Sequence, residues 1–274
     1  MKSPRIGVFD SGFGGLTVLR ALLRHIPDAC YSFLGDTARL PYGSKSRRTI
    51  AHYAAEGAQF LVNQQGAEYL VIACNTASAL ALDAIQDAVP VPVLGVVEPG
   101  ALAARAASKS GDVLVIATAA TVQSHAYAAA CEARGLRALE KACPLLVPLV
   151  EEGWTDHPVT AQVIDVYLSE LRAEAQAAGL RYDALVLGCT HYPLIRPLLE
   201  KAVTPGVRVI DSAEATAEAA MRHFNGNGAN PADSIPDTAQ VRCFATDSVE
   251  KFERLGSRFL GRPTGRVELV DLGG

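Results

Sequence analysis

The sequence has 274 residues, which is long enough for one large or two medium domains with a substantial hydrophobic core. Its composition, 49% hydrophobic and 20% charged, is globular and excludes bulk disorder, and a net charge of -4 gives no basic surface for nucleic acid or a membrane. No stretch is apolar for long enough to span a bilayer, and the first apolar run is too short for a signal peptide, so we expect a cytoplasmic protein.

Short, continuous apolar runs alternate with helical patterns along the chain, as strands covered on both faces do. The strand candidates, in chain order, are Ile6–Phe9, Tyr31–Leu34, Tyr69–Ala73, Val93–Gly95, Val113–Ala117, Ala184–Leu187, Val207–Ile210 and a weaker Val241–Phe244. Two helical faces are formed by Ile50, Tyr53, Ala54, Gly57 and Leu61 before Gly66, and by Val159, Val163, Val166, Tyr167 and Leu171 before Gly179. This alternation predicts an α/β protein with mainly parallel sheets.

The two halves of the chain show a coarse internal similarity. In each half, a strand-end position (Asp10 or near Thr118) precedes a strand-end cysteine (Cys74 or Cys189) at a similar sequence distance. We therefore expect two pseudo-symmetric α/β domains that face each other across a cleft. The expected boundaries are residues 1–98 plus 212–274 for the first domain and 99–211 for the second. The Gly-, Asn-, Pro- and Asp-rich segment Asn225–Asp237 predicts a surface loop.

Cys74 and Cys189 each end an apolar strand at a probable helix N-terminus. The partial positive charge of a helix start favours a thiolate, which can act as a nucleophile or as a proton-transferring base. Ligands gather at the carboxyl ends of parallel strands, so a pair of strand-end thiols suggests one shared site. The 6 cysteines are spread out, without the close spacing that a zinc site or a disulfide scaffold needs.

The segment DSGFGG, from Asp10 to Gly15, predicts a Gly-rich turn between a strand and a helix, which can bind an anion through its backbone N–H groups. A dinucleotide site is an alternative, with Asp36 as its ribose-binding acid, although Thr17 stands where a third Gly is required. A second alternative is that the DSGFGG turn binds no ligand and only packs the helix on the strand. His191 could ionise Cys189 or hold a substrate group.

Five segments together resemble glutamate racemases, of the cofactor-independent aspartate/glutamate racemase superfamily. They are IGVFDSGFGGLTVL, FLGDTARLPYG, ACNTASA, PLVPLVEEG and GCTHYPL, and they follow the family order. The resemblance implies a two-domain α/β fold and interconversion of L- and D-glutamate without pyridoxal phosphate or metal. It further implies a role in bacterial peptidoglycan synthesis, a small-molecule partner (glutamate) and a possible homodimer.

The resemblance also implies roles for individual residues. Cys74 and Cys189 would transfer the protons, assisted by Asp10, His191 and an acid that we place at Glu152, with Glu151 left open. The residues implied to hold the substrate are Asp10, Ser11, Tyr42, Gly43, Asn75, Thr76, Thr190 and His191. Two opposed acid/base groups suit this chemistry, because inversion of the α-carbon removes a proton from one face and returns one to the other.

Other functions make different demands on the sequence. A pyridoxal enzyme needs a Schiff-base lysine, and none of the six lysines follows a core strand end in a ligand-like turn, although Lys141 stays open. Aspartate racemase is the nearest alternative. A non-catalytic module that binds a small anion or a nucleotide through DSGFGG is the alternative from another class, but it gives no reason for the paired cysteines.

Overall fold

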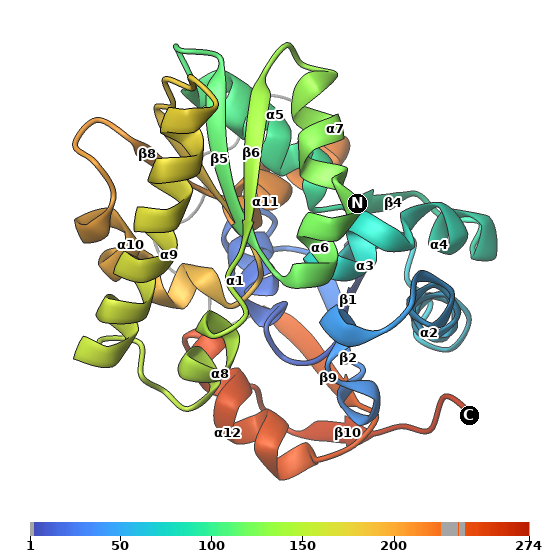
Figure 1. The fold of residues 1–274 in the computed structure, drawn as a ribbon. Coiled ribbons are helices and arrows are strands. Elements are labelled where there is room, and N and C mark those ends of the chain that lie inside the picture. The colour runs from blue at the N-terminus through green and yellow to red at the C-terminus, as the bar shows by residue number, and fades with distance from the viewer. Residues whose placement is uncertain (1–2, 226–234, 236–238, 274) are drawn as a thin grey trace.

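The computed structural model of the protein describes residues 3–225, 235 and 239–273, which form two β-sheets with helices packed against them (Figure 1). The larger sheet contains β1 (Arg5–Asp10), β2 (Cys30–Gly35), β3 (Tyr69–Ile72), β4 (Val93–Gly95), β9 (Gln240–Ala245) and β10 (Val267–Leu269). The smaller sheet contains β5 (Asp112–Ala117), β6 (Arg137–Ala142), β7 (Ala184–Gly188) and β8 (Arg208–Asp211). All strand pairs among the described residues are parallel, which confirms the predicted fold class.

The two sheets repeat one topology. The larger sheet has the order β10-β9-β2-β1-β3-β4 and the smaller β6-β5-β7-β8, so β2-β1-β3-β4 corresponds to β6-β5-β7-β8. In both sheets the strand order changes sense at the first strand of the repeat (β1 or β5): the next strand is added on one side of it and the following strand on the other. Ligand crevices open at such a point in parallel sheets. Cys74 follows β3 and Cys189 follows its counterpart β7, so the two thiols occupy equivalent positions. The pseudo-symmetric arrangement is confirmed, while the domain boundaries at 98/99 and 211/212 stay a prediction.

Helices cover the faces of both sheets. Their bounds are α1 (Leu16–His25), α2 (Arg47–Gln59), α3 (Asn75–Leu80), α4 (Leu82–Ala88), α5 (Val97–Ala107), α6 (Ala119–Ser124), α7 (Ala126–Glu132), α8 (Leu146–Glu151), α9 (Pro158–Ala177), α10 (Arg196–Ala202), α11 (Ser212–Asn225) and α12 (Val249–Leu260). Every residue of β3, β5 and β7 is buried, which explains why these strands are continuous apolar runs. One apolar cluster includes Val8 of β1 and Ile116 of β5, so the core runs through both halves.

Two strands, β6 and β10, were not predicted from the sequence pattern. Strand β6 reads RALEKA, lies at a sheet edge and buries none of its residues fully, so it has no apolar run to recognise. Strand β10 has only 3 residues. The segment Asn225–Asp237 lies almost entirely outside the described residues. No helix in the described part of the chain is long and apolar enough to cross a membrane.

The two predicted helices exist, but one faces differently from the prediction. Helix α2 passes into a π-helical turn before Gly66, whose φ of 67° suits glycine. On α9, Val159 and Val166 are 39% and 56% exposed. The buried face instead consists of Thr160, Ile164, Leu168, Leu171 and Ala175. The prediction of the inward face of α9 was therefore wrong for Val159 and Val166, because Thr160 and Ala175 carry little hydrophobic signal although they pack inward.

Candidate active site

A cavity of about 480 Å³ opens at the carboxyl ends of the central strands of both sheets. Its lining comes from both halves of the chain: Ser11, Leu40, Pro41, Tyr42, Gly43, Ser44, Cys74, Asn75, Thr76, Thr118, Ala119, Pro144, Val147, Pro148, Glu151, Cys189, Thr190, His191 and Lys251. The two strand-end thiols thus line one cavity, each contributed by the equivalent strand of its sheet.

Cys74 is the residue from which α3 begins. Its Sγ accepts a hydrogen bond from the N–H of Ala77 at 3.4 Å and lies 3.4 Å from the hydroxyl of Ser11. Burial, and next the negative charge of Asp10, raise the pKa of Cys74 to about 12. Burial and Asp10 therefore outweigh the partial positive charge at the start of α3. Cys74 keeps its proton at neutral pH, in contrast to the thiolate expected from sequence.

The surroundings of Cys189 have the opposite charge. Nδ1 of His191 lies 4.0 Å from Sγ of Cys189, and Nε2 lies 3.3 Å from Oε1 of Glu151. Burial disfavours the imidazolium, but the interactions with Cys189 and Glu151 prevail and raise the pKa of His191 to about 10. Lys251 of α12 adds a second cation 3.6 Å from Oε2 of Glu151. A positive charge therefore lies beside Cys189, whereas a carboxylate lies near Cys74.

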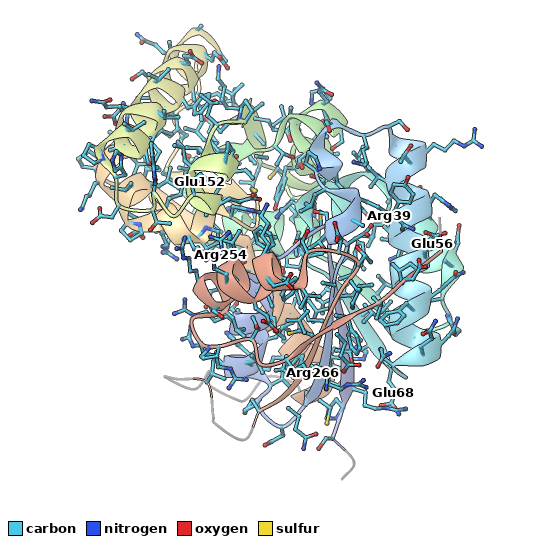
Figure 2. All side chains as sticks on the ribbon, turned by 90° about the horizontal axis from the view of Figure 1, so that it is seen from below. Arg39, Glu56, Glu68, Glu152, Arg254 and Arg266 are labelled. Atoms are coloured by element: carbon cyan, nitrogen blue, oxygen red, sulfur yellow. The ribbon has the colours of Figure 1, made fainter. Side chains whose placement is uncertain are left out.

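Of the two candidate assisting acids, the structure brings Glu151 to the cavity and not Glu152, where the sequence analysis placed it. Glu151 lines the cavity and contacts His191, whereas Glu152 is exposed at the end of α8 (Figure 2). Glu152 borders a separate apolar hollow together with Leu145, Leu149 and Trp154. Adjacent residues of a helix point about 100° apart, so only one of two neighbouring glutamates can face the cavity. The sequence contains both and cannot tell which one α8 turns inward.

The Gly-rich turn binds an anion that belongs to the protein itself. The N–H of Gly12 donates to Oδ2 of Asp10 at 2.9 Å. Burial raises the pKa of Asp10, while His191 and the N–H groups of Gly12, Gly15 and Ser11 oppose that rise. Asp36, the candidate ribose-binding acid, is fully buried and accepts hydrogen bonds from Tyr42 and Thr246. A dinucleotide would need the N–H groups of the turn and the carboxylate of Asp36, and both are engaged by hydrogen bonds within the protein.

Glycine in this turn also lets the two halves approach closely. A Cβ at Gly14 would lie 2.4 Å from Oγ1 of Thr190 and 2.6 Å from Nδ1 of His191. The hydroxyl of Thr17 donates to the backbone carbonyl of Thr190 at 3.0 Å. The DSGFGG turn therefore packs directly on the loop that carries Cys189 and His191.

Most of the expected substrate residues lie together. Of the residues implied by resemblance, Ser11, Tyr42, Gly43, Asn75, Thr76, Thr190 and His191 line the cavity. Asp10 is not part of the lining, but it is buried beside it, and its Oδ1 has no hydrogen-bond partner within the described structure.

Sequence reasoning missed some residues of the site. Thr118 comes directly after β5, at the strand end where Asp10 ends β1, so the internal similarity could have identified it; its Oγ1 lies 3.1 Å from that of Thr76. Lys251 carried no sequence signal, because α12 brings it to the cavity from the far end of the chain. Lys141 pairs with Glu170 and Glu174 instead. Among the described residues, no group of three or more His, Cys, Asp or Glu side chains could hold a metal ion.

The fold agrees with comparisons to known proteins. The family model for Asp/Glu/Hydantoin racemase matches residues 7–220, and the chain belongs to that family. It is therefore an isomerase. A glutamate racemase of Koribacter versatilis is 56% identical over 100% of this chain and 99% of its own.

Solved structures show the same likeness. Glutamate racemase isoform RacE1 of Bacillus anthracis superimposes with a TM-score of 0.87 at 37% identity, covering 99% of both chains. The Francisella tularensis glutamate racemase, solved in complex with D-glutamate, gives 0.84 at 34% identity and covers 99% of both chains.

Proposed function

We propose that this enzyme interconverts L- and D-glutamate with Cys74 and Cys189 as paired acid/base groups, and that its D-glutamate serves bacterial peptidoglycan synthesis. The observation that carries the proposal is that one thiol from each half lines the same cavity. Relatives that match nearly the whole chain are named glutamate racemase, which supports the substrate.

The charges around the two thiols suggest the direction of the first step. The imidazolium of His191 stabilises negative charge at Cys189, which suits this thiol to act as a base. The resemblance to glutamate racemases assigns it the α-proton of L-glutamate. Cys74, with its pKa of about 12, holds the proton that the opposite face of the α-carbon receives. The reverse reaction, from D-glutamate, requires the thiols to exchange these proton states.

The cavity also offers groups for the developing charge. Proton removal makes the α-carbon carbanion-like, and its charge spreads onto the substrate carboxylate. Donors at the start of α3 and the side chains of Asn75 and Thr190 would hold that carboxylate, and one such preorganised donor contributes about 3 kcal/mol. The carboxylate of Asp10 would compensate the substrate ammonium.

We propose that no pyridoxal cofactor takes part. Among the lysines that the structure describes, Lys251 lines the cavity, and its ammonium interacts with Glu151. Lys141, the lysine left open by sequence, pairs with two glutamates of α9. Two thiols that serve as base and acid in turn provide the proton transfers without an electron sink.

A cytoplasmic location and a homodimer remain proposals; sedimentation of the purified protein would test the dimer.

Racemisation in deuterium oxide tests the two-base mechanism. With no added cofactor, circular dichroism should show either glutamate enantiomer reaching the same final mixture, with no cofactor band near 400 nm. The first product formed should carry α-deuterium, while recovered substrate should carry almost none, because the product takes its proton from the opposite, solvent-exchanged thiol. Cys74→Ala and Cys189→Ala should each abolish racemisation in both directions.

Several outcomes would refute the proposal. Activity only with added pyridoxal phosphate would rule out the cofactor-free reaction, and activity only with aspartate would rule out the substrate. Early deuterium in recovered substrate would indicate a single base. A Cys189→Ala variant that racemises near the parent rate would exclude the paired thiols.

A further inference from the structure

Tyr127 makes a hydrogen bond that links the two halves of the site. Its hydroxyl donates to Oδ1 of Asn75 at 2.7 Å. Tyr127 lies on α7, which packs on β6 of the smaller sheet, whereas Asn75 begins α3, the helix that follows β3 of the larger sheet. Both side chains are buried, with 0% and 3% of their surface exposed. A residue outside the cavity lining therefore fixes a residue that lines it.

The hydrogen bond sets which end of the Asn75 carboxamide is left without a partner. A carboxamide has an acceptor oxygen and a donor N–H2 group. Tyr127 engages the oxygen, and Nδ2 is buried with no partner within the described structure. A buried donor left unpaired costs about 1–3 kcal/mol, so it favours a ligand that supplies an acceptor. The opposite orientation would present the carbonyl oxygen, which repels a carboxylate.

The ring of Tyr127 is held so that its hydroxyl keeps this position. A Cβ at Gly188 would lie 3.0 Å from Cε2 of the ring, and one at Gly100 would lie 3.1 Å from Cε1 and 3.3 Å from the hydroxyl oxygen. The two glycines thus leave room for the ring and confine it on both edges. Burial raises the pKa of Tyr127, so the hydroxyl retains its proton and stays a donor.

We propose that Tyr127 is a positioning residue that holds Asn75 with its N–H2 group presented to a carboxylate of the substrate. Tyr127 acts through Asn75 and does not itself line the cavity. The inference rests on the proposed function, because it specifies how the glutamate site recognises its anion. Its consequence is that substrate affinity depends on a contact between the two halves.

Replacing Tyr127 with Phe tests this directly, because the change removes only the hydroxyl. The matched control is Tyr31→Phe, since Tyr31 is also buried, and its hydroxyl donates to the carbonyls of Leu22 and Ile26 away from the cavity. We expect Tyr127→Phe to raise KM for both enantiomers about 3- to 10-fold, as expected for one lost hydrogen bond, with kcat changed by less than about 2-fold. Tyr31→Phe should lower the melting temperature but leave KM unchanged.

A double-mutant cycle tests whether Tyr127 acts through Asn75. Calorimetric titration with racemic glutamate measures affinity without a contribution from net racemisation. In an Asn75→Ala background, Tyr127→Phe should change the Kd by less than about 2-fold, because its target is gone. An unchanged KM in Tyr127→Phe, or an equal loss of affinity with and without Asn75, would overturn the inference. If the parent itself fails to racemise glutamate, the proposed function fails instead.

Discussion

Nε2 of His191 lies 3.3 Å from Oε1 of Glu151, and this contact joins the loop after β7 to α8 at the edge of the cavity. The opposite ring nitrogen of His191 lies 4.0 Å from Sγ of Cys189. The carboxylate therefore acts on the thiol through the imidazole, by favouring its protonated form. The same carboxylate also interacts with Lys251 of α12, which lies beside α8 (Figure 1).

Removing the charge of Glu151 should slow the reaction. Glu151→Gln lowers the fraction of protonated His191, so we expect kcat to fall about 10- to 100-fold in the direction from L-glutamate, which is less than the loss of a proton-transferring group itself would cause. The matched control is Glu152→Gln, one residue away and exposed, which should retain parental kinetics. Steady-state kinetics by circular dichroism compares the two variants. Equal losses in both would contradict the placement of Glu151.

The protonation of His191 should also appear in the pH dependence of stability. The folded protein raises the pKa of His191 from 6.5 to about 10, so it holds this proton to a higher pH than the unfolded chain does. The resulting stabilisation is complete below pH 6.5 and is lost as the pH rises towards about 10. Urea unfolding should therefore show that His191→Gln is most destabilising near pH 6 and least near pH 10. A difference that grows with pH would count against the charged imidazole.

The thiols should differ in their reactivity towards iodoacetamide. The sequence predicts that a helix start favours the thiolate at both Cys74 and Cys189, but burial and Asp10 raise the pKa of Cys74 to about 12. We now expect Cys189 to react well before Cys74 and before three other thiols whose pKa is raised chiefly by burial: Cys131, Cys143 and Cys243.

Glutamate provides the control for this alkylation experiment. Saturating glutamate should protect Cys189, whereas the half-buried Cys30, outside the cavity, should be labelled equally with and without it. Mass-spectrometric mapping measures each site. Fastest labelling at Cys131 or Cys243, or protection of Cys30, would refute the assignment.

A methyl group at Gly14 should disturb the catalytic loop. The added Cβ of Gly14→Ala would overlap Thr190 and His191, so the loop that carries Cys189 must shift, and we expect kcat/KM to fall at least about 100-fold. Gly179→Ala is the comparison, because Gly179 lies outside the cavity lining and its added Cβ would meet no described atom within 4 Å. It should cost much less activity. Circular dichroism spectra verify that both variants fold, and a Gly14→Ala variant with parental kinetics would show that the contact is unimportant.

The parts of the site that follow from sequence are those with a local pattern. An apolar run that stops at a cysteine before polar residues identifies both Cys74 and Cys189, because strand and helix start are encoded within a few neighbouring residues. The same reasoning recovers the parallel strands that are covered on both faces. It fails for β6, whose edge position leaves it without an apolar run.

Other features depend on how distant segments meet. The rotation of α8 decides between Glu151 and Glu152, and the packing of α12 and α7 brings Lys251 to the cavity and Tyr127 to Asn75. The protonation of Cys74 depends on its burial and on Asp10 from another strand. The sequence alone determined the two thiols and their equivalent strands, because these are local properties. Only the tertiary structure decided their charges and supporting partners, because electrostatic fields and hydrogen bonds act between groups that are close in space and far apart in the chain.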